Sequence, residues 1–95
     1  MSADHWLIAY DIRDGKRLGK VAKAVSSYGW RIQKSVFESE ADEMAMNELK
    51  RRLDGITAPE DFVLILSVCE KDWQKRTVYG NDEAYNPMNG TYMVL

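Results

Sequence analysis

The sequence predicts an α+β domain in which one antiparallel sheet carries two helices on one face. Three observations lead to this prediction. Two short runs are almost wholly apolar, two longer segments repeat their apolar residues at helical spacing, and strand-like and helix-like segments alternate along the chain. With 95 residues, the chain is long enough for one domain and too short for two.

The first third of the chain predicts a strand followed by a helix. Residues 6–12 (WLIAYDI) are mostly apolar and bulky, which is typical of a central strand covered on both faces. Asp14 and Gly15 interrupt this pattern, and a helix with one buried stripe is expected over residues 16–28. Gly29 is expected to end that helix in the left-handed conformation. The residues of the stripe are Leu18, Val21, Ala22, Val25 and Tyr28.

The middle of the chain predicts two strands and a second helix. Residues 30–33 and 35–39 are enriched in strand-forming side chains, although no turn signal marks the boundary between them. Asp42 is expected to cap the second helix, which Gly55 and Pro59 close. The buried stripe of this helix consists of Ala45, Met46, Leu49, Leu53 and Ile56.

The last third predicts a further strand and a tail. Residues 62–69 (FVLILSVC) are typical of another central strand, and residues 77–79 of a short one. Right-handed crossovers in the order strand, helix, strand, strand, helix, strand produce a ferredoxin-like βαββαβ arrangement. We therefore expect a ferredoxin-like domain over residues 1–80 and a C-terminal tail over residues 81–95. The apolar end of the tail, residues 91–95, is expected to add a strand to a sheet edge, either in its own subunit or at a dimer or partner interface.

Cysteine use and hydropathy indicate the compartment. The single Cys69 cannot form an internal disulfide, and the first residues lack the pattern of a signal peptide. No apolar stretch approaches the ~20 residues of a membrane helix. We expect a cytoplasmic protein without a membrane span.

The net charge of −2 conceals a strong segregation of charge. Residues 13–34 hold seven basic side chains and one acidic side chain, a charge of +6, whereas the rest of the chain holds six basic and 14 acidic ones, a charge of −8. Such a segment predicts a local positive face that attracts a polyanion, although a merely solvated helix face fits the same pattern. The basic residues are Arg13, Lys16, Arg17, Lys20, Lys23, Arg31 and Lys34.

Asp11 is the leading candidate for chemistry. A carboxylate at the end of an apolar strand is costly unless something compensates its charge, and a divalent cation does so. Mg²⁺ is usually held by one or two protein carboxylates, so a single Asp11 per chain requires a two-fold axis that brings two of them together. The alternative interpretation is that Asp11 stabilises the loop into the first helix without a metal, although Asp14 is better placed to cap that helix.

Several motifs carry a resemblance to a known family. They are Tyr10-Asp11-Ile12, Lys16-Arg17, Lys20-Val21-Ala22-Lys23, Tyr28-Gly29, Arg31-Ile32-Gln33 and Ser35-Val36-Phe37-Glu38. Over about residues 6–80, the chain resembles the CRISPR-associated Cas-two family of prokaryotic antiviral defence. The resemblance implies a homodimeric, Mg²⁺-dependent endonuclease that acts on RNA or double-stranded DNA and works with the CRISPR integrase in spacer acquisition.

The resemblance also implies a catalytic site. It places Tyr10, Arg31 and Phe37 beside Asp11, with Phe37 in a role that packing alone would also explain. The homodimer it implies agrees with the expectation of one Mg²⁺ shared by two Asp11 residues. The family often has two adjacent acids where this chain has Asp14 followed by glycine, which weakens the expectation of efficient hydrolysis.

Two further functions stay open at this point. One is a non-catalytic dimeric scaffold that grips double-stranded DNA through the basic residues and recruits the integrase. The other is a regulatory ferredoxin-like domain that binds a small ligand at its dimer interface.

Overall fold

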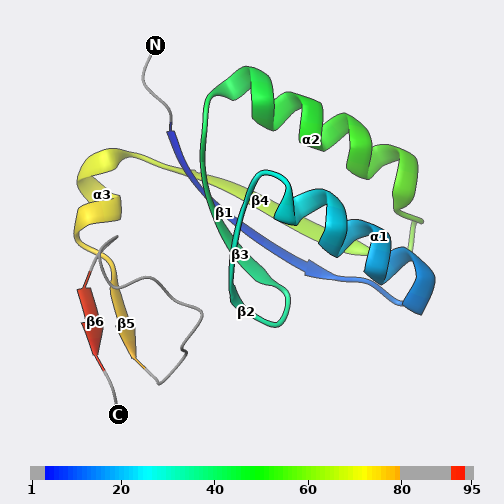
Figure 1. Cartoon of the computed structure of the whole chain (residues 1–95), viewed down its shortest axis with the longest axis horizontal. Coiled ribbons are helices and arrows are strands. Elements are labelled where there is room, and N and C mark those ends of the chain that lie inside the picture. The colour runs from blue at the N-terminus through cyan, green and yellow to red at the C-terminus, as the bar shows by residue number, and fades with distance from the viewer. Residues whose placement is uncertain (1–3, 80–90, 94–95) are drawn as a thin grey trace.

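A computed structural model describes residues 4–79 and 91–93 of the chain. Its elements are β1 (Asp4–Asp11), α1 (Gly15–Ser26), β2 (Gly29–Gln33), β3 (Val36–Ala41), α2 (Glu43–Ile56), β4 (Phe62–Val68), α3 (Glu70–Gln74), β5 (Thr77–Tyr79) and β6 (Thr91–Met93) (Figure 1).

Strands β1 to β4 form one antiparallel sheet in the order β2-β3-β1-β4, and α1 and α2 cover one of its faces (Figure 1). The predicted α+β, ferredoxin-like fold is therefore confirmed. The core lies between the sheet and the two helices, because alternate side chains of β1 point into it. Its main members are Trp6, Ile8, Tyr10, Val21, Val25, Phe37, Met46 and Leu49.

Strand β4 lies at an edge of the sheet, so the prediction of a second central strand is wrong. It pairs with β1 alone in this sheet, and its residues alternate between partly buried and exposed. Val63 and Ile65 pack against the core, whereas Phe62, Leu64 and Leu66 are 58%, 44% and 48% exposed. We call these three exposed residues the outer stripe, because they lie on the sheet face that α1 and α2 do not cover.

Both predicted helices form, with small changes at their ends. The Asp14 and Asp42 side chains cap α1 and α2 by accepting hydrogen bonds from the backbone N–H groups of Arg17 and Ala45. Within α1, Leu18 is exposed and Ala24 is buried, contrary to the predicted stripe.

Gly29 has a different role from the predicted one. Helix α1 ends at Ser26, and Gly29 is the first residue of β2, where no left-handed backbone is present. A Cβ atom at Gly29 would lie 2.1 Å from the carbonyl oxygen of Glu38. Glycine is therefore required by the close approach of β2 to β3, not by a helix stop.

The C-terminal part of the described chain holds one unexpected element. The five-residue helix α3 follows β4, where the sequence predicts no element. Gly55 is expected to close α2 but lies inside it. The predicted strand at residues 77–79 is present as β5, which pairs in parallel with β6 in a separate two-stranded sheet (Figure 1). The rest of the predicted tail lies outside the described residues. Among the described helices, none has the length and hydropathy that crossing a membrane requires.

Candidate functional site

Asp11 ends β1 on the uncovered face of the sheet. It is in register with Phe62 of the outer stripe, and its side chain is 62% exposed. The nearest cation is the guanidinium of Arg13, with 3.5 Å between Nη2 and the Asp11 Oδ2. The burial cost argued from the sequence is therefore absent, because the strand end leaves the carboxylate in water.

Asp11 by itself would offer one carboxylate to a metal ion such as Mg²⁺. Carboxylate oxygens are suitable Mg²⁺ ligands, and an exposed Asp11 is free to point toward a second subunit. The described residues contain no group of three or more His, Cys, Asp or Glu side chains that would hold a metal ion by themselves. Asp14 is committed to α1, since its Oδ2 accepts the Arg17 backbone N–H at 3.0 Å. The donor set therefore fits Mg²⁺ only when a second copy of Asp11 completes it.

Tyr10, Phe37 and Arg31 form a separate group on the helix-covered face. Tyr10 and Phe37 are 4% and 1% exposed, with their ring centroids 6.0 Å apart. The Arg31 guanidinium lies 5.1 Å from the Phe37 centroid. Because consecutive strand residues point to opposite faces, Tyr10 and Asp11 are directed away from each other. The structure therefore does not bring these three side chains together with the Asp11 carboxylate.

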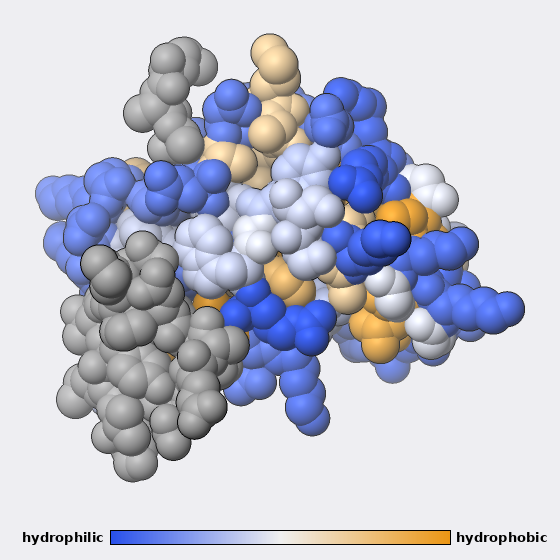
Figure 2. Space-filling model, in the orientation of Figure 1, coloured by the Kyte–Doolittle hydropathy of each residue, from blue (hydrophilic) through white to orange (hydrophobic). Residues whose placement is uncertain are grey.

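The basic residues of the positive segment differ in their availability. Lys16, Lys20 and Lys23 are exposed on α1, and Figure 2 shows that the surface of this view is mainly hydrophilic, with hydrophobic residues in small separate patches. Arg13, Arg31 and Lys34 are exposed as well. Arg17 differs from the other six, because its guanidinium is paired with two carboxylates.

Asp61 is the partner of Arg17 and was missed in the sequence. Its side chain is fully buried, and Arg17 Nε lies 2.8 Å from its Oδ2. Hydrogen bonds from the Arg17 guanidinium, followed by those from backbone N–H groups, hold the pKa of Asp61 well below its usual range. No local pattern marks Asp61, which is 44 residues away from Arg17 in the sequence.

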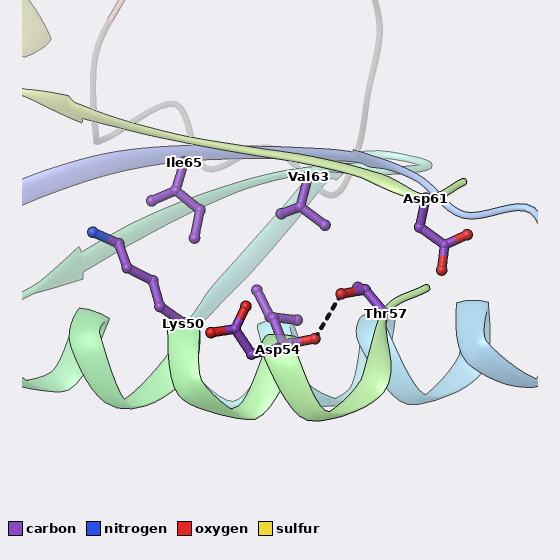
Figure 3. A pocket seen from close by; sticks show the side chains of 7 residues that line it. Lys50, Asp54, Thr57, Asp61, Val63 and Ile65 are labelled. Carbon is purple, nitrogen blue, oxygen red and sulfur yellow. Dashed lines mark hydrogen bonds between the residues drawn. The ribbon is translucent and has the colours of Figure 1, made fainter. Parts of the chain in front are cut away.

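A cavity of about 360 Å³ lies between α2 and β4. Figure 3 shows Val63 and Ile65 pointing from β4 toward α2, which contributes Lys50 and Asp54 to the lining. Since Val63 and Ile65 alternate with the outer stripe, this cavity opens on the opposite face of the sheet from Asp11. It is therefore not part of the Asp11 site.

Helix α3 is anchored to the start of β1. The His5 ring is buried and stacks on Trp73 with 4.5 Å between ring centroids, and its Nε2 lies 2.7 Å from Glu70 Oε1. The hydrogen bond with His5 lowers the pKa of Glu70. On β3, Glu38 forms an ion pair of 3.3 Å with Arg76, which follows α3. His5 thus anchors α3 and lies at the end of β1 remote from Asp11.

Comparison with known proteins decides the family. The family model described as CRISPR associated protein Cas2 matches residues 4–76, which run from the start of β1 to two residues past α3. This chain belongs to the Cas2 family. The resemblance found in the sequence motifs is thereby confirmed.

Individual Cas2 proteins agree with this assignment. A protein of Synechocystis sp. named CRISPR-associated endoribonuclease Cas2 2 is 31% identical over 86 residues, covering 88% of this chain and 92% of its own length. A Thermus thermophilus protein named CRISPR-associated endonuclease Cas2 2 is 47% identical over 47 residues, covering 50% of this chain and 52% of its own. A solved structure titled "Crystal structure of cas2" is 30% identical and has a TM-score of 0.75, covering 90% of this chain and 95% of its own.

Proposed function

We propose that this Cas2-family protein is a homodimeric, Mg²⁺-dependent endonuclease that acts in the cytoplasm during CRISPR spacer acquisition. Its relatives are named endoribonucleases or endonucleases, which supports a phosphodiester substrate. The observation that carries the proposal is the position of Asp11, exposed and in register with the outer stripe.

The outer stripe argues for a second copy of the chain as its partner. Phe62, Leu64 and Leu66 leave a row of large apolar side chains in water, and on β1 the neighbours of Leu64 and Leu66 are Ala9 and Leu7. A two-fold axis through this face would cover the stripe of each subunit with the same surface of the other. It would also bring the two Asp11 carboxylates to one place, which a single-chain site cannot achieve.

Each side chain then has a distinct task. The two Asp11 carboxylates would hold Mg²⁺, which when bound stabilises charge on the scissile phosphate and acidifies a water molecule. Arg13, 3.5 Å from Asp11, is the cation closest to the carboxylate and is placed to bind the same phosphate. Lys16, Lys20 and Lys23 would bind the nucleic-acid backbone farther from the reacting atoms.

Substitution of Asp11 tests the proposal. Asp11→Asn keeps the shape of the side chain but removes the charge that binds the metal, so Mg²⁺-dependent cleavage of labelled RNA and of a labelled DNA duplex should fall by about 100-fold or more. Asp72→Asn removes another exposed acidic side chain, on α3, and this variant should cleave like wild type. Unchanged cleavage by the Asp11→Asn protein would eliminate the metal role.

The alternative function is a non-catalytic scaffold for the CRISPR integrase. The exposed cations of α1 favour it, since they can bind duplex DNA whether or not Asp11 holds a metal. Lys16→Gln with Lys20→Gln should then weaken duplex binding and reduce the slope of log affinity against log salt by about 0.9 per lost phosphate contact. Lys71→Gln in α3 with Lys75→Gln at its C-cap is the matched control. Salt-dependent binding without cleavage under any metal condition would favour the scaffold over the nuclease.

A further inference from the structure

The Asp61 carboxylate lies at the junction of three segments of the chain. Each of its two oxygens accepts two hydrogen bonds, four in all. Oδ1 accepts the backbone N–H of Arg13 at 3.0 Å and Nη2 of Arg17 at 3.2 Å. Oδ2 accepts Nε of Arg17 at 2.8 Å and the backbone N–H of Ala58 at 2.9 Å. Its hydrogen-bonding capacity is thus filled by donors from the β1–α1 loop, from α1 and from its own loop.

The hydrogen bond to Arg13 reaches the candidate site directly. The pairing of β1 with β4 ends at Asp11 and Phe62, so the ladder itself does not hold the chain beyond Asp11. Asp61 precedes Phe62 and binds the backbone of Arg13, two residues past the last pair. It thereby extends the connection between the two strands past the end of β1. We call the segment from Asp11, the last residue of β1, to Arg13 the Asp11–Arg13 loop.

Arg17 strengthens this connection. The planar guanidinium binds both Asp61 oxygens, and Nη2 also donates to Glu60 Oε2 at 3.3 Å. The backbone N–H of Arg17 is held by the Asp14 cap, so the helix start, the guanidinium and Asp61 are fixed together. A guanidinium bound in this way serves the loop and is not available to grip a phosphate.

We propose that Asp61, held by Arg17, is a positioning residue that fixes the Asp11–Arg13 loop for catalysis through the backbone N–H of Arg13. This inference rests on the proposed nuclease function and reassigns Arg17 from nucleic-acid binding to support of the site. The low pKa of Asp61 agrees with a carboxylate that stays ionised, and keeps its four hydrogen bonds, over the working range of pH.

Two neighbouring variants provide a matched test. Asp61→Asn replaces one of the two accepting oxygens with an NH₂ donor, which then faces either the Arg13 and Arg17 donors at Oδ1 or the Arg17 and Ala58 donors at Oδ2. In either orientation the side chain is no longer held by all four hydrogen bonds, and its grip on the Arg13 N–H is weakened. Glu60→Gln removes the same charge from the same guanidinium but leaves the bond to Arg13 intact. Both variants have the same net charge, so a purely electrostatic effect on nucleic-acid binding would affect them alike.

Three measurements on the full chain test whether Asp61 positions the loop: the rate of cleavage, the binding of duplex DNA and the exchange of backbone amide hydrogens. For Asp61→Asn, kcat for Mg²⁺-dependent cleavage of labelled RNA or duplex DNA should fall by about 10- to 100-fold with little change in KM. Duplex binding in chelator should stay at the wild-type level. Amide hydrogen exchange at Arg13 should accelerate, while that at Tyr10, whose N–H donates to the Ser35 carbonyl in the turn between β2 and β3, should not. Glu60→Gln should match wild type in all three.

The outcomes separate positioning from general stability and from the function itself. Wild-type exchange at Arg13 in Asp61→Asn, or an equal loss of kcat in Glu60→Gln, would overturn the inference, as would faster exchange throughout the sheet. If Asp61→Asn does not fold, Arg17→Lys keeps the charge but loses the two-oxygen fork and should show the same fall in kcat and faster exchange at Arg13. If the wild-type protein cleaves neither nucleic acid, the nuclease proposal fails, and exchange at Arg13 alone decides whether Asp61 holds the loop.

Discussion

The same substitution at two glycines should have opposite effects on stability. Gly19 lies in the middle of α1, where a Cβ atom would meet nothing within 4 Å. Gly29 lies in β2, where a Cβ atom would lie 2.1 Å from the Glu38 carbonyl oxygen and 3.0 Å from both its carbonyl carbon and the Ser39 Cβ. Two of these three neighbours are backbone atoms of β3, so relief requires the two strands to separate.

The magnitudes follow from these surroundings. Gly19→Ala should raise the free energy of unfolding by about 1 kcal/mol, the difference in helix propensity between the two residues. Gly29→Ala should lower it by about 2 to 3 kcal/mol, because a rigid overlap with backbone lies at the upper end of overpacking costs. In a domain of this size, these changes correspond to a melting temperature raised by about 4–8 °C and lowered by about 10–20 °C, respectively.

Thermal unfolding followed by circular dichroism at one fixed protein concentration measures both effects. The fixed concentration removes any contribution from association. If Gly29→Ala melts at or above the wild-type temperature, the close approach of β2 to β3 is wrong. If Gly19→Ala is destabilising, the surface of α1 around Gly19 is not open as the structure shows it.

Three further predictions concern the core, the outer stripe and the Asp61 pair. Phe37→Ala should cost about 3–5 kcal/mol of stability, whereas Phe37→Leu should retain most of it, and cleavage by Phe37→Leu at a temperature where it is folded tests whether the ring has any role beyond packing. Leu64→Lys should weaken dimerisation by about 2 kcal/mol or more, roughly 30-fold in Kd by sedimentation, because it buries an unpaired charge. Met44→Lys, on exposed helical surface, should leave Kd unchanged. Since Asp61 has a lowered pKa, its stabilising effect is present above about pH 4 and is lost as the pH falls further, so the gap in melting temperature between wild type and Asp61→Asn should close in acid.

Local patterns in the sequence were sufficient for most of the fold. The helical repeats and the Asp14 and Asp42 caps located α1 and α2, and the apolar run located β1, because these signals act within a few residues. The five residues of α3 are too few for a helical repeat to be visible, and their anchor is the contact of Trp73 with His5 at the other end of the chain.

The errors at β4 and Gly29 share a physical cause. An apolar run does not reveal whether both faces are covered within one chain, and the outer stripe is apolar although α1 and α2 leave it open. A glycine after a helical repeat fits a left-handed stop and a close strand contact equally well. In both cases the deciding neighbour, a second surface or the backbone of β3, is absent from the local sequence.

The positions of the candidate residues in the fold could be predicted only in part. Asp11 and Arg13 lie together, and six of the seven basic residues are exposed. The sequence could not indicate that Arg17 faces a buried Asp61, because that pair is formed only when the α2–β4 loop folds against α1. It also gave no reason to separate Tyr10 from Asp11, which strand geometry directs to opposite faces.

The central claim is that a two-fold axis pairs Asp11 residues around one metal ion. Mn²⁺ is a paramagnetic ion that shares the preference of Mg²⁺ for carboxylate ligands. Electron paramagnetic resonance measures how many Mn²⁺ ions bind per chain at equilibrium, and sedimentation of the same samples measures the oligomeric state. We predict about one tightly bound ion per two chains in the dimeric wild type, and none in Asp11→Asn that remains dimeric. Binding that survives in Asp11→Asn, or a wild-type protein that is monomeric at every concentration, would contradict the account.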